Sequence, residues 1–167
     1  MAATATPDLS ARHVFNSLHG DWLLERGMGD MGHFTGTARF FIANDSAANS
    51  LRYREEGIFH RHDGQRFDGY REYDFILLEN AIEVLFRDPV GFGNRYVLLS
   101  FSPANISNSN IPENSLFAQD HHPCGNDMYH HRMFWQDANH FETRIKVTGP
   151  NKDYELHSLY QRQTTQN

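Results

Sequence analysis

Residues 121–132, HHPCGNDMYHHR, carry four histidines, an aspartate and the only cysteine of the chain. Imidazole, thiolate and carboxylate groups are the usual zinc ligands of proteins, and imidazole beside a carboxylate is the usual apparatus for moving protons. His121 and Cys124 could supply two zinc ligands, with His131 or Asp127 as a third. The same residues could instead perform acid/base chemistry, or none, and the choice depends on which side chains face one another.

The elements that position these residues follow from the hydrophobic pattern. Pro7, Asp8 and Ser10 are typical of a helix start and Gly20 of a helix end, so a short helix is predicted over residues 8–19. After Gly20 the pattern has period two, which is typical of strands. Nine strands are predicted: 21–26, 33–43, 51–60, 65–78, 81–86, 96–102, 126–135, 140–148 and 153–162.

Short hairpin connections between these strands predict an all-β fold, an up-and-down antiparallel barrel of about nine strands after the N-terminal helix. The chain is predicted to be a single domain over residues 1–167, with the barrel at 21–162 and a tail at 163–167. Residues 103–123 are rich in Asn, Ser and Pro and aperiodic, so a long loop is predicted there. A barrel of this size can hold one small ligand.

Composition argues against several classes of partner. The net charge is -6 with histidine neutral, and no basic block is present, so no nucleic-acid partner is expected. No stretch approaches the roughly 18 apolar residues of a membrane span. One cysteine allows no intramolecular disulfide, and the first residues contain no apolar signal region, so a cytoplasmic protein is expected.

Strand parity sorts the side chains between the two faces of the sheet. Tyr53 and Glu55 share a face with Leu51, and Asp127, Tyr129 and His131 share another row. The ionisable side chains predicted to face the interior are Arg26, Glu55, Arg71, Asp127, His131 and Arg162. Buried charges must be paired. Two interpretations remain open: a structural ion-pair network, or a ligand pocket with an acid/base group.

The second interpretation assigns roles to particular residues. His131 would transfer protons, Asp127 would orient its imidazole, and Tyr129 would hydrogen-bond a substrate carbonyl. Desolvation would raise the pKa of Glu55 and make it a second acid/base candidate. The predicted pocket wall is Arg26, Tyr53, Arg71, Tyr73, Trp135 and Tyr154. His121 and His122 would flank the mouth, and Cys124 is predicted to be a small buried residue.

Several motifs resemble known proteins. Gly20-Asp21-Trp22 after a short helix, together with Arg162 at the last strand, resembles the calycin arrangement of lipocalins and fatty-acid-binding proteins, in which tryptophan packs on a terminal arginine. Phe34-x-Gly36-x-Ala38, Leu51-x-Tyr53-x-Glu55-x-Gly57 and Val147-x-Gly149-Pro150-x-Lys152-Asp153-Tyr154 extend the match. Together they resemble a family of small calycin-like proteins of unknown function. The resemblance implies a calycin-type barrel and no particular activity.

Two function classes follow. The first is a cofactor-independent enzyme that binds a hydrophobic or aromatic molecule and catalyses proton transfer in an isomerisation, cyclisation or dehydration. The second is a non-catalytic carrier or sensor of a small ligand, with haem or zinc binding less favoured. No cofactor and no metal are predicted, the expected partner is a small molecule, and the oligomeric state is left open, with a homodimer as one option. A protein-interaction module would need an exposed apolar stripe, which the pattern does not show.

Overall fold

A computed structural model describes residues 10–104 and 115–164 of the chain. One helix, α1 (Ser10–Leu18), precedes the strands, and a single 3-10 turn, η1 (Gly29–Met31), separates the first two. The strands are β1 (Gly20–Gly27), β2 (Gly32–Phe41), β3 (Ser50–Arg61), β4 (Arg66–Leu77), β5 (Ile82–Phe86), β6 (Arg95–Leu99), β7 (Ser102–Pro103), β8 (Leu116–Cys124), β9 (Asp127–Asp137), β10 (His140–Thr148) and β11 (Asp153–Arg162). The fold is therefore all-β, as the sequence predicts, and the predicted helix start at residue 8 lies outside the described residues.

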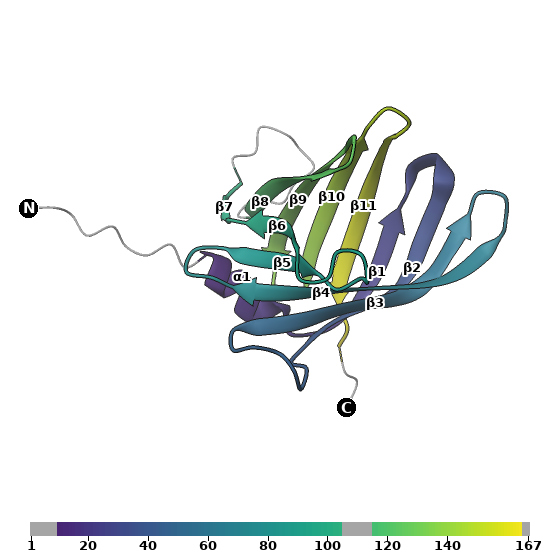
Figure 1. Ribbon diagram of the computed structural model, residues 1–167. Helices are drawn as coiled ribbons and strands as arrows, with labels where there is room; N and C mark the ends of the chain where they lie inside the picture. The colour runs from purple at the N-terminus through teal and green to yellow at the C-terminus, as the bar shows by residue number, and fades with distance from the viewer. Residues whose placement is uncertain (1–9, 105–114, 165–167) are drawn as a thin grey trace, which may run out of the picture.

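All the strands belong to one curled antiparallel sheet, in the order β6-β5-β4-β3-β2-β1-β11-β10-β9-β8-β7 (Figure 1). Strands β6 and β8 lie against each other although no backbone ladder joins them among the described residues. The Asp120 carboxylate of β8 accepts a 2.7 Å hydrogen bond from the Leu98 amide of β6. The sheet is thus an incompletely closed barrel whose seam is sealed by a side chain.

The strand count differs from the predicted nine because β8 lies almost wholly in the segment predicted as a long loop, and the predicted strand 96–102 divides into β6 and the start of β7. Strand β8 pairs with β9 along its whole length, from Leu116–Trp135 to Cys124–Asp127. A two-residue turn joins them, and its Gly125 has a φ of 59°, which glycine adopts without strain. The polar residues and Pro123 made this segment look like a loop in the sequence. They are tolerated in the strand because it lies near the sheet edge.

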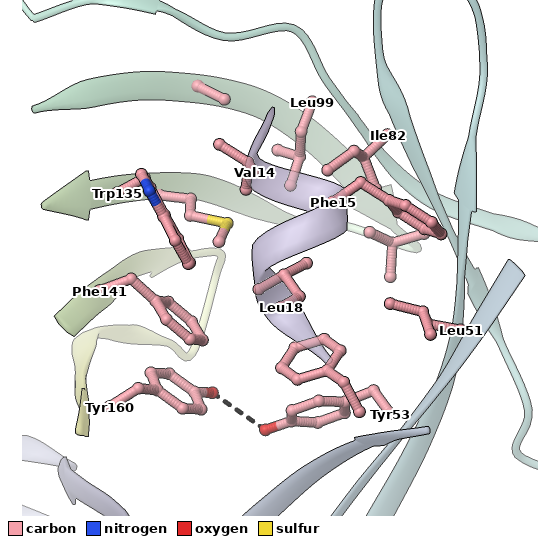
Figure 2. Packing of buried hydrophobic residues seen from close by; sticks show 14 of the residues in the cluster. Val14, Phe15, Leu18, Leu51, Tyr53, Ile82, Leu99, Trp135, Phe141 and Tyr160 are labelled. Atoms are coloured by element: carbon pink, nitrogen blue, oxygen red, sulfur yellow. Dashed lines mark hydrogen bonds between the residues drawn. The ribbon is translucent and has the colours of Figure 1, made fainter. Parts of the chain in front are cut away.

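One end of the barrel is filled by helix α1, whose Ala11, Val14, Phe15 and Leu18 are buried. Figure 2 shows this helix among core side chains that the strands contribute. The Trp22 ring packs edge-on against Phe141 at 4.8 Å between ring centroids, and the Arg162 guanidinium lies over the Trp22 ring at 4.3 Å. Arg162 also donates hydrogen bonds to the backbone carbonyls of Ser17, His19 and Ala138. The tryptophan–arginine pairing expected from the motif therefore closes this end.

Candidate ligand-binding cavity

The opposite end of the barrel is open and contains two adjoining spaces. A mouth of about 570 Å³ is walled by residues such as Phe86, His122 and Tyr129. Below it lies an inner cavity of about 60 Å³. Arg71, Tyr73 and Tyr96 line both spaces and so form the neck between them.

Aromatic rings from four strands form the wall of this open end. Tyr73 of β4 and Tyr96 of β6 stack with their planes 19° apart and their centroids 5.6 Å apart. Phe86 of β5 lies 5.1 Å from Tyr96, and His122 of β8 lies 5.3 Å from it. Rings clustered in this way offer apolar, polarisable faces to a planar guest.

A paired polar network forms the floor of the inner cavity. The Arg26 guanidinium binds both carboxylate oxygens of Glu55 at 2.8 Å and donates to Ser158 at 2.6 Å. The Tyr53 hydroxyl donates to Glu55 and lies 3.0 Å from the Tyr160 hydroxyl. Figure 2 draws this last contact as a dashed line. The interior charges at this level are thus satisfied within the protein.

The pKa of Glu55 corrects the prediction made from its burial. Burial alone raises this pKa, but the hydrogen bonds and charge of Arg26, with the hydroxyl of Tyr53, bring it below its ordinary value. Glu55 is therefore an ionised carboxylate that is held by Arg26 and Tyr53, and it is not a proton donor. The same surroundings raise the pKa of Tyr53, mainly through burial and the nearby negative charge of Glu55.

His131 lies at the inner cavity, where its Nδ1 is 3.3 Å from the Tyr96 hydroxyl. Burial lowers the pKa of His131 to about 4, although the charge of Asp120 acts in the opposite direction. The imidazole is therefore neutral over the physiological range and can accept a proton. Asp120, the cross-strand partner of His131, already accepts hydrogen bonds from the Leu98 and His121 amides.

Asp127 does not orient His131, which corrects the second prediction for this row. Its carboxylate forms an ion pair with Lys152 at 2.8 Å, at the hairpin end of the strand. The two residues share a face, but they are four positions apart on an extended strand. At about 3.3 Å per residue this spacing separates them by more than a hydrogen bond can span.

Arg71 differs from the other cavity arginines. Its hydrogen bond within the described residues runs from Nη1 to the Tyr73 hydroxyl at the long distance of 3.5 Å. Among the described residues, no carboxylate lies within 4.0 Å of this guanidinium. Glu55 stands opposite Arg71 in the β3–β4 register, but Arg26 and Tyr53 occupy its oxygens.

The structure brings most of the predicted site residues to the two spaces. Those at the inner cavity or the mouth are Arg26, Tyr53, Glu55, Arg71, Tyr73, His122, Tyr129 and His131. Asp127 and Tyr154 line neither space, and Trp135 packs instead against Trp22 and Phe141 at the closed end. His121 lies on the other face, stacked on His130 at 4.2 Å, because consecutive strand residues alternate.

Several residues that line the two spaces were not among the predicted site residues, and Tyr96 and Phe86 are the most prominent of them. Tyr96 and Phe86 lie in short apolar strands where period two gives no contrast between the faces. Cys124 is exposed at the mouth rather than buried, because it ends β8 beside the turn. Across residues 10–104 and 115–164, no three His, Cys, Asp or Glu side chains are grouped as a metal site would require. No helix in the described part of the chain has the length and apolar character of a membrane span.

The fold and the cavity define a β-barrel protein with a helix-filled end and an open end. The chain belongs to the family described as a family of unknown function, DUF6314, whose model matches residues 18–162. Comparison with curated proteins finds no match.

Solved structures with a similar fold include the S-type phycobiliprotein lyase CPES from Guillardia theta. It matches with a TM-score of 0.55 and 11% sequence identity over 93% of each chain. A redesigned β-barrel, mFAP1, bound to DFHBI, matches with a TM-score of 0.44 and 13% identity over 89% of this chain and 97% of its own. At these identities the likeness concerns the fold alone.

Proposed function

We propose that this protein is a calycin-type barrel that binds a small organic molecule with an aromatic or hydrophobic body at its open end. The observation that carries the proposal is the mouth of about 570 Å³, whose wall is built from aromatic rings in contact with one another. Ligand pockets of proteins are typically concave spaces of a few hundred Å³ or more, mostly apolar and with a few placed polar groups. The mouth and neck have these properties.

The position of the ligand follows from the two volumes. The inner cavity, at about 60 Å³, has room for a few water molecules but not for an aromatic ring system. The body of the molecule therefore lies in the mouth, against Phe86, Tyr96 and His122, and only a small group reaches the inner cavity. This placement differs from a ligand enclosed deep in the barrel, since helix α1 and its core partners fill that volume.

The exposed Cys124 gives a direct test of the mouth, because it is the only cysteine and lines that space. Binding of the neutral fluorescent probe N-phenyl-1-naphthylamine is measured before and after Cys124 is coupled to a poly(ethylene glycol) maleimide. We expect saturable binding of the probe, with an affinity that falls about tenfold or more after coupling because the polymer obstructs the mouth. This corresponds to a loss of roughly 1.4 kcal/mol of binding free energy. The Cys124→Ser variant, treated in the same way, keeps the affinity of untreated protein.

Two outcomes contradict the binding proposal. Absence of saturable binding to the unlabelled protein would remove the pocket. Equal binding by the coupled and uncoupled protein would place the probe somewhere other than the mouth. Native mass spectrometry of the freshly purified protein would then be used to look for a molecule retained from the cell.

Proton transfer is a second candidate, favoured by one specific observation. His131 offers an unprotonated imidazole to the inner cavity, 3.3 Å from the Tyr96 hydroxyl, and this geometry lets it accept a proton, although the burial that lowers its pKa to about 4 also weakens it as a base. A similar structure is named as a lyase, which is a property of that protein. Here the group of the ligand that reaches the inner cavity would be the one that loses or gains a proton.

Deuterium exchange separates a carrier from such an enzyme. A molecule that co-purifies with the protein is incubated in D₂O with wild-type protein or with His131→Asn, and its mass is followed. We expect the wild type to incorporate deuterium at a carbon position and His131→Asn to retain binding without exchange. Binding with no exchange in the wild type would leave the carrier function and exclude the enzyme.

A further inference from the structure

The geometry points to an organic anion as the ligand class: Arg71, at the neck of the cavity, binds a carboxylate head group while the aromatic wall holds the body of the molecule. This inference rests on the proposed binding function and adds the chemistry of the ligand. It assigns to Arg71 the role of the specificity-determining residue of the open end.

Arg71 is the arginine at this end that has no carboxylate within 4.0 Å among the described residues; Glu55 acts on it only over a longer distance. Three arginines line the two spaces in the described part of the chain. Arg26 is held by Glu55 at 2.8 Å, and Arg87 is held by Asp74 at 2.6 Å and approached by Glu72 at 3.7 Å. Arg71 retains almost all of its five N–H donors for another partner.

The acids near the neck are committed elsewhere. Glu55 gives both oxygens to Arg26, and Glu72 pairs with Arg54 at 2.7 Å as well as lying near Arg87. The Asp88 carboxylate accepts hydrogen bonds from the Val90 and Gly91 amides of its own turn. Glu55 and Glu72 cannot turn to Arg71 without leaving an arginine unpaired, and Asp88 does not lie within 4.0 Å of the Arg71 guanidinium.

The neutral groups around Arg71 complete the argument. His131 carries no charge near neutral pH, and Arg26 and Glu55 cancel, so the inner cavity has a net charge contributed by Arg71 alone. A guanidinium presents two parallel N–H donors that match the two oxygens of a carboxylate. The stacked Tyr73 and Tyr96 lie beside it, so a head group at Arg71 brings an attached ring system against these faces.

A matched pair of fluorescent probes tests this inference. N-phenyl-1-naphthylamine is neutral, and 8-anilinonaphthalene-1-sulfonate carries the same ring system with an added anionic group. We expect the wild-type chain to bind the anion more tightly. In Arg71→Gln the affinity for the anion falls about tenfold or more, as loss of a charge-assisted hydrogen bond implies, while that for the neutral probe changes less than about twofold.

Arg66 supplies the matched control, because it lies on the same strand, is exposed and lines neither space. Arg66→Gln removes the same charge and leaves both affinities unchanged. Arg71→Lys keeps the charge without the two-donor geometry, and we expect it to fall between the wild type and Arg71→Gln. Circular dichroism melting of each variant confirms folding, and Arg71→Lys serves as the test if Arg71→Gln does not fold.

The possible outcomes distinguish failure of the anion site at Arg71 from failure of the proposed binding function. If the neutral probe binds but the wild type shows no preference for the anion, Arg71 is not an anion site and the ligand is neutral. If Arg66→Gln and Arg71→Gln weaken anion binding equally, the effect is the general charge of the protein and the inference is overturned. If neither probe binds the wild type, the binding function itself fails.

Discussion

At the closed end of the barrel, Trp22 is fully buried between Phe141 and Arg162, and helix α1 fills the remaining space with Val14 and Leu18. At the open end, the aromatic rings of Tyr73, Tyr96 and His122 contact one another around a space that the protein leaves unfilled. Both ends use aromatic residues and an arginine. The difference is that the Arg162 guanidinium donates hydrogen bonds to three backbone carbonyls, whereas the Arg71 guanidinium donates only one long hydrogen bond, to Tyr73.

This contrast shows how function can be separated from structure in a barrel with charged residues at both ends. A charged group that stabilises the fold has its hydrogen bonds made within the protein. A charged group that recognises a ligand keeps hydrogen-bond donors without a protein partner. The free energy cost of leaving the charge unpaired is tolerated because water reaches the group. The Arg26–Glu55 pair lies between the two ends and belongs by this criterion to the fold.

Breaking the Arg26–Glu55 pair is expected to have the largest effect on stability. In Glu55→Gln the Arg26 guanidinium stays buried without its carboxylate, which should cost about 3–5 kcal/mol of unfolding free energy in a urea titration. The double variant Arg26→Met/Glu55→Met removes both charges and should recover most of that loss. A near-normal stability of Glu55→Gln would mean that water reaches the pair, and that it belongs to the ligand site instead.

Removing part of the closed-end packing should have a somewhat smaller effect. Leu18→Ala deletes a side chain with 0% exposure in the helix that fills the barrel, and such deletions cost about 2–5 kcal/mol. The control is Leu23→Ala, whose side chain is 44% exposed on the outer face and should change stability by less than about 0.5 kcal/mol. Equal losses in the two variants would show that helix α1 is not part of the core.

The third effect concerns pH and appears only in acid. The pKa of His131 is about 4 in the folded chain against an ordinary value of 6.5, so the unfolded chain takes up the proton more readily. The stability that the neutral His131 contributes is present above pH 6.5 and is lost as the pH falls from 6.5 towards 4. NMR titration of the imidazole should give the depressed pKa directly.

His131→Asn should flatten the acid dependence of unfolding over that range. The groups that act on His131 come from different strands: the charge of Asp120 raises its pKa, and the charges of Arg26 and His130 lower it. An imidazole that titrates at its ordinary pKa would show that the inner cavity is open to water.

Much of the fold could be predicted from period two and from the tryptophan motif. The inward row of Tyr53 and Glu55 follows from the local pattern, and the pairing of Trp22 with Arg162 was implied by the resemblance to calycins. Strand β8 could not be predicted, because polar residues at a sheet edge resemble a loop. The cavity was only partly predictable: parity assigns a residue to a face, but it does not say which carboxylate a given arginine reaches.

The candidate site shows this limit most clearly. Asp127 shares the face of His131, yet distance along the strand separates them, and the acid that faces His131 is Asp120 on the neighbouring strand. Similarly, Glu55 stands opposite Arg71 in register but binds Arg26. Competition between partners is a three-dimensional property, and it leaves no trace in the spacing of residues.

The side-chain seam between β6 and β8 has a consequence for the range of molecules the barrel can accept. The sheet is closed except between β6 and β8, where Tyr96 of β6 faces His122 of β8 across the gap. Widening the gap would break the Leu98–Asp120 hydrogen bond and the contacts of Tyr96 with His122 and His131, and would leave every backbone ladder intact. The diameter of the open end is thus adjustable, while the diameter of the closed end is set by the packing around Trp22.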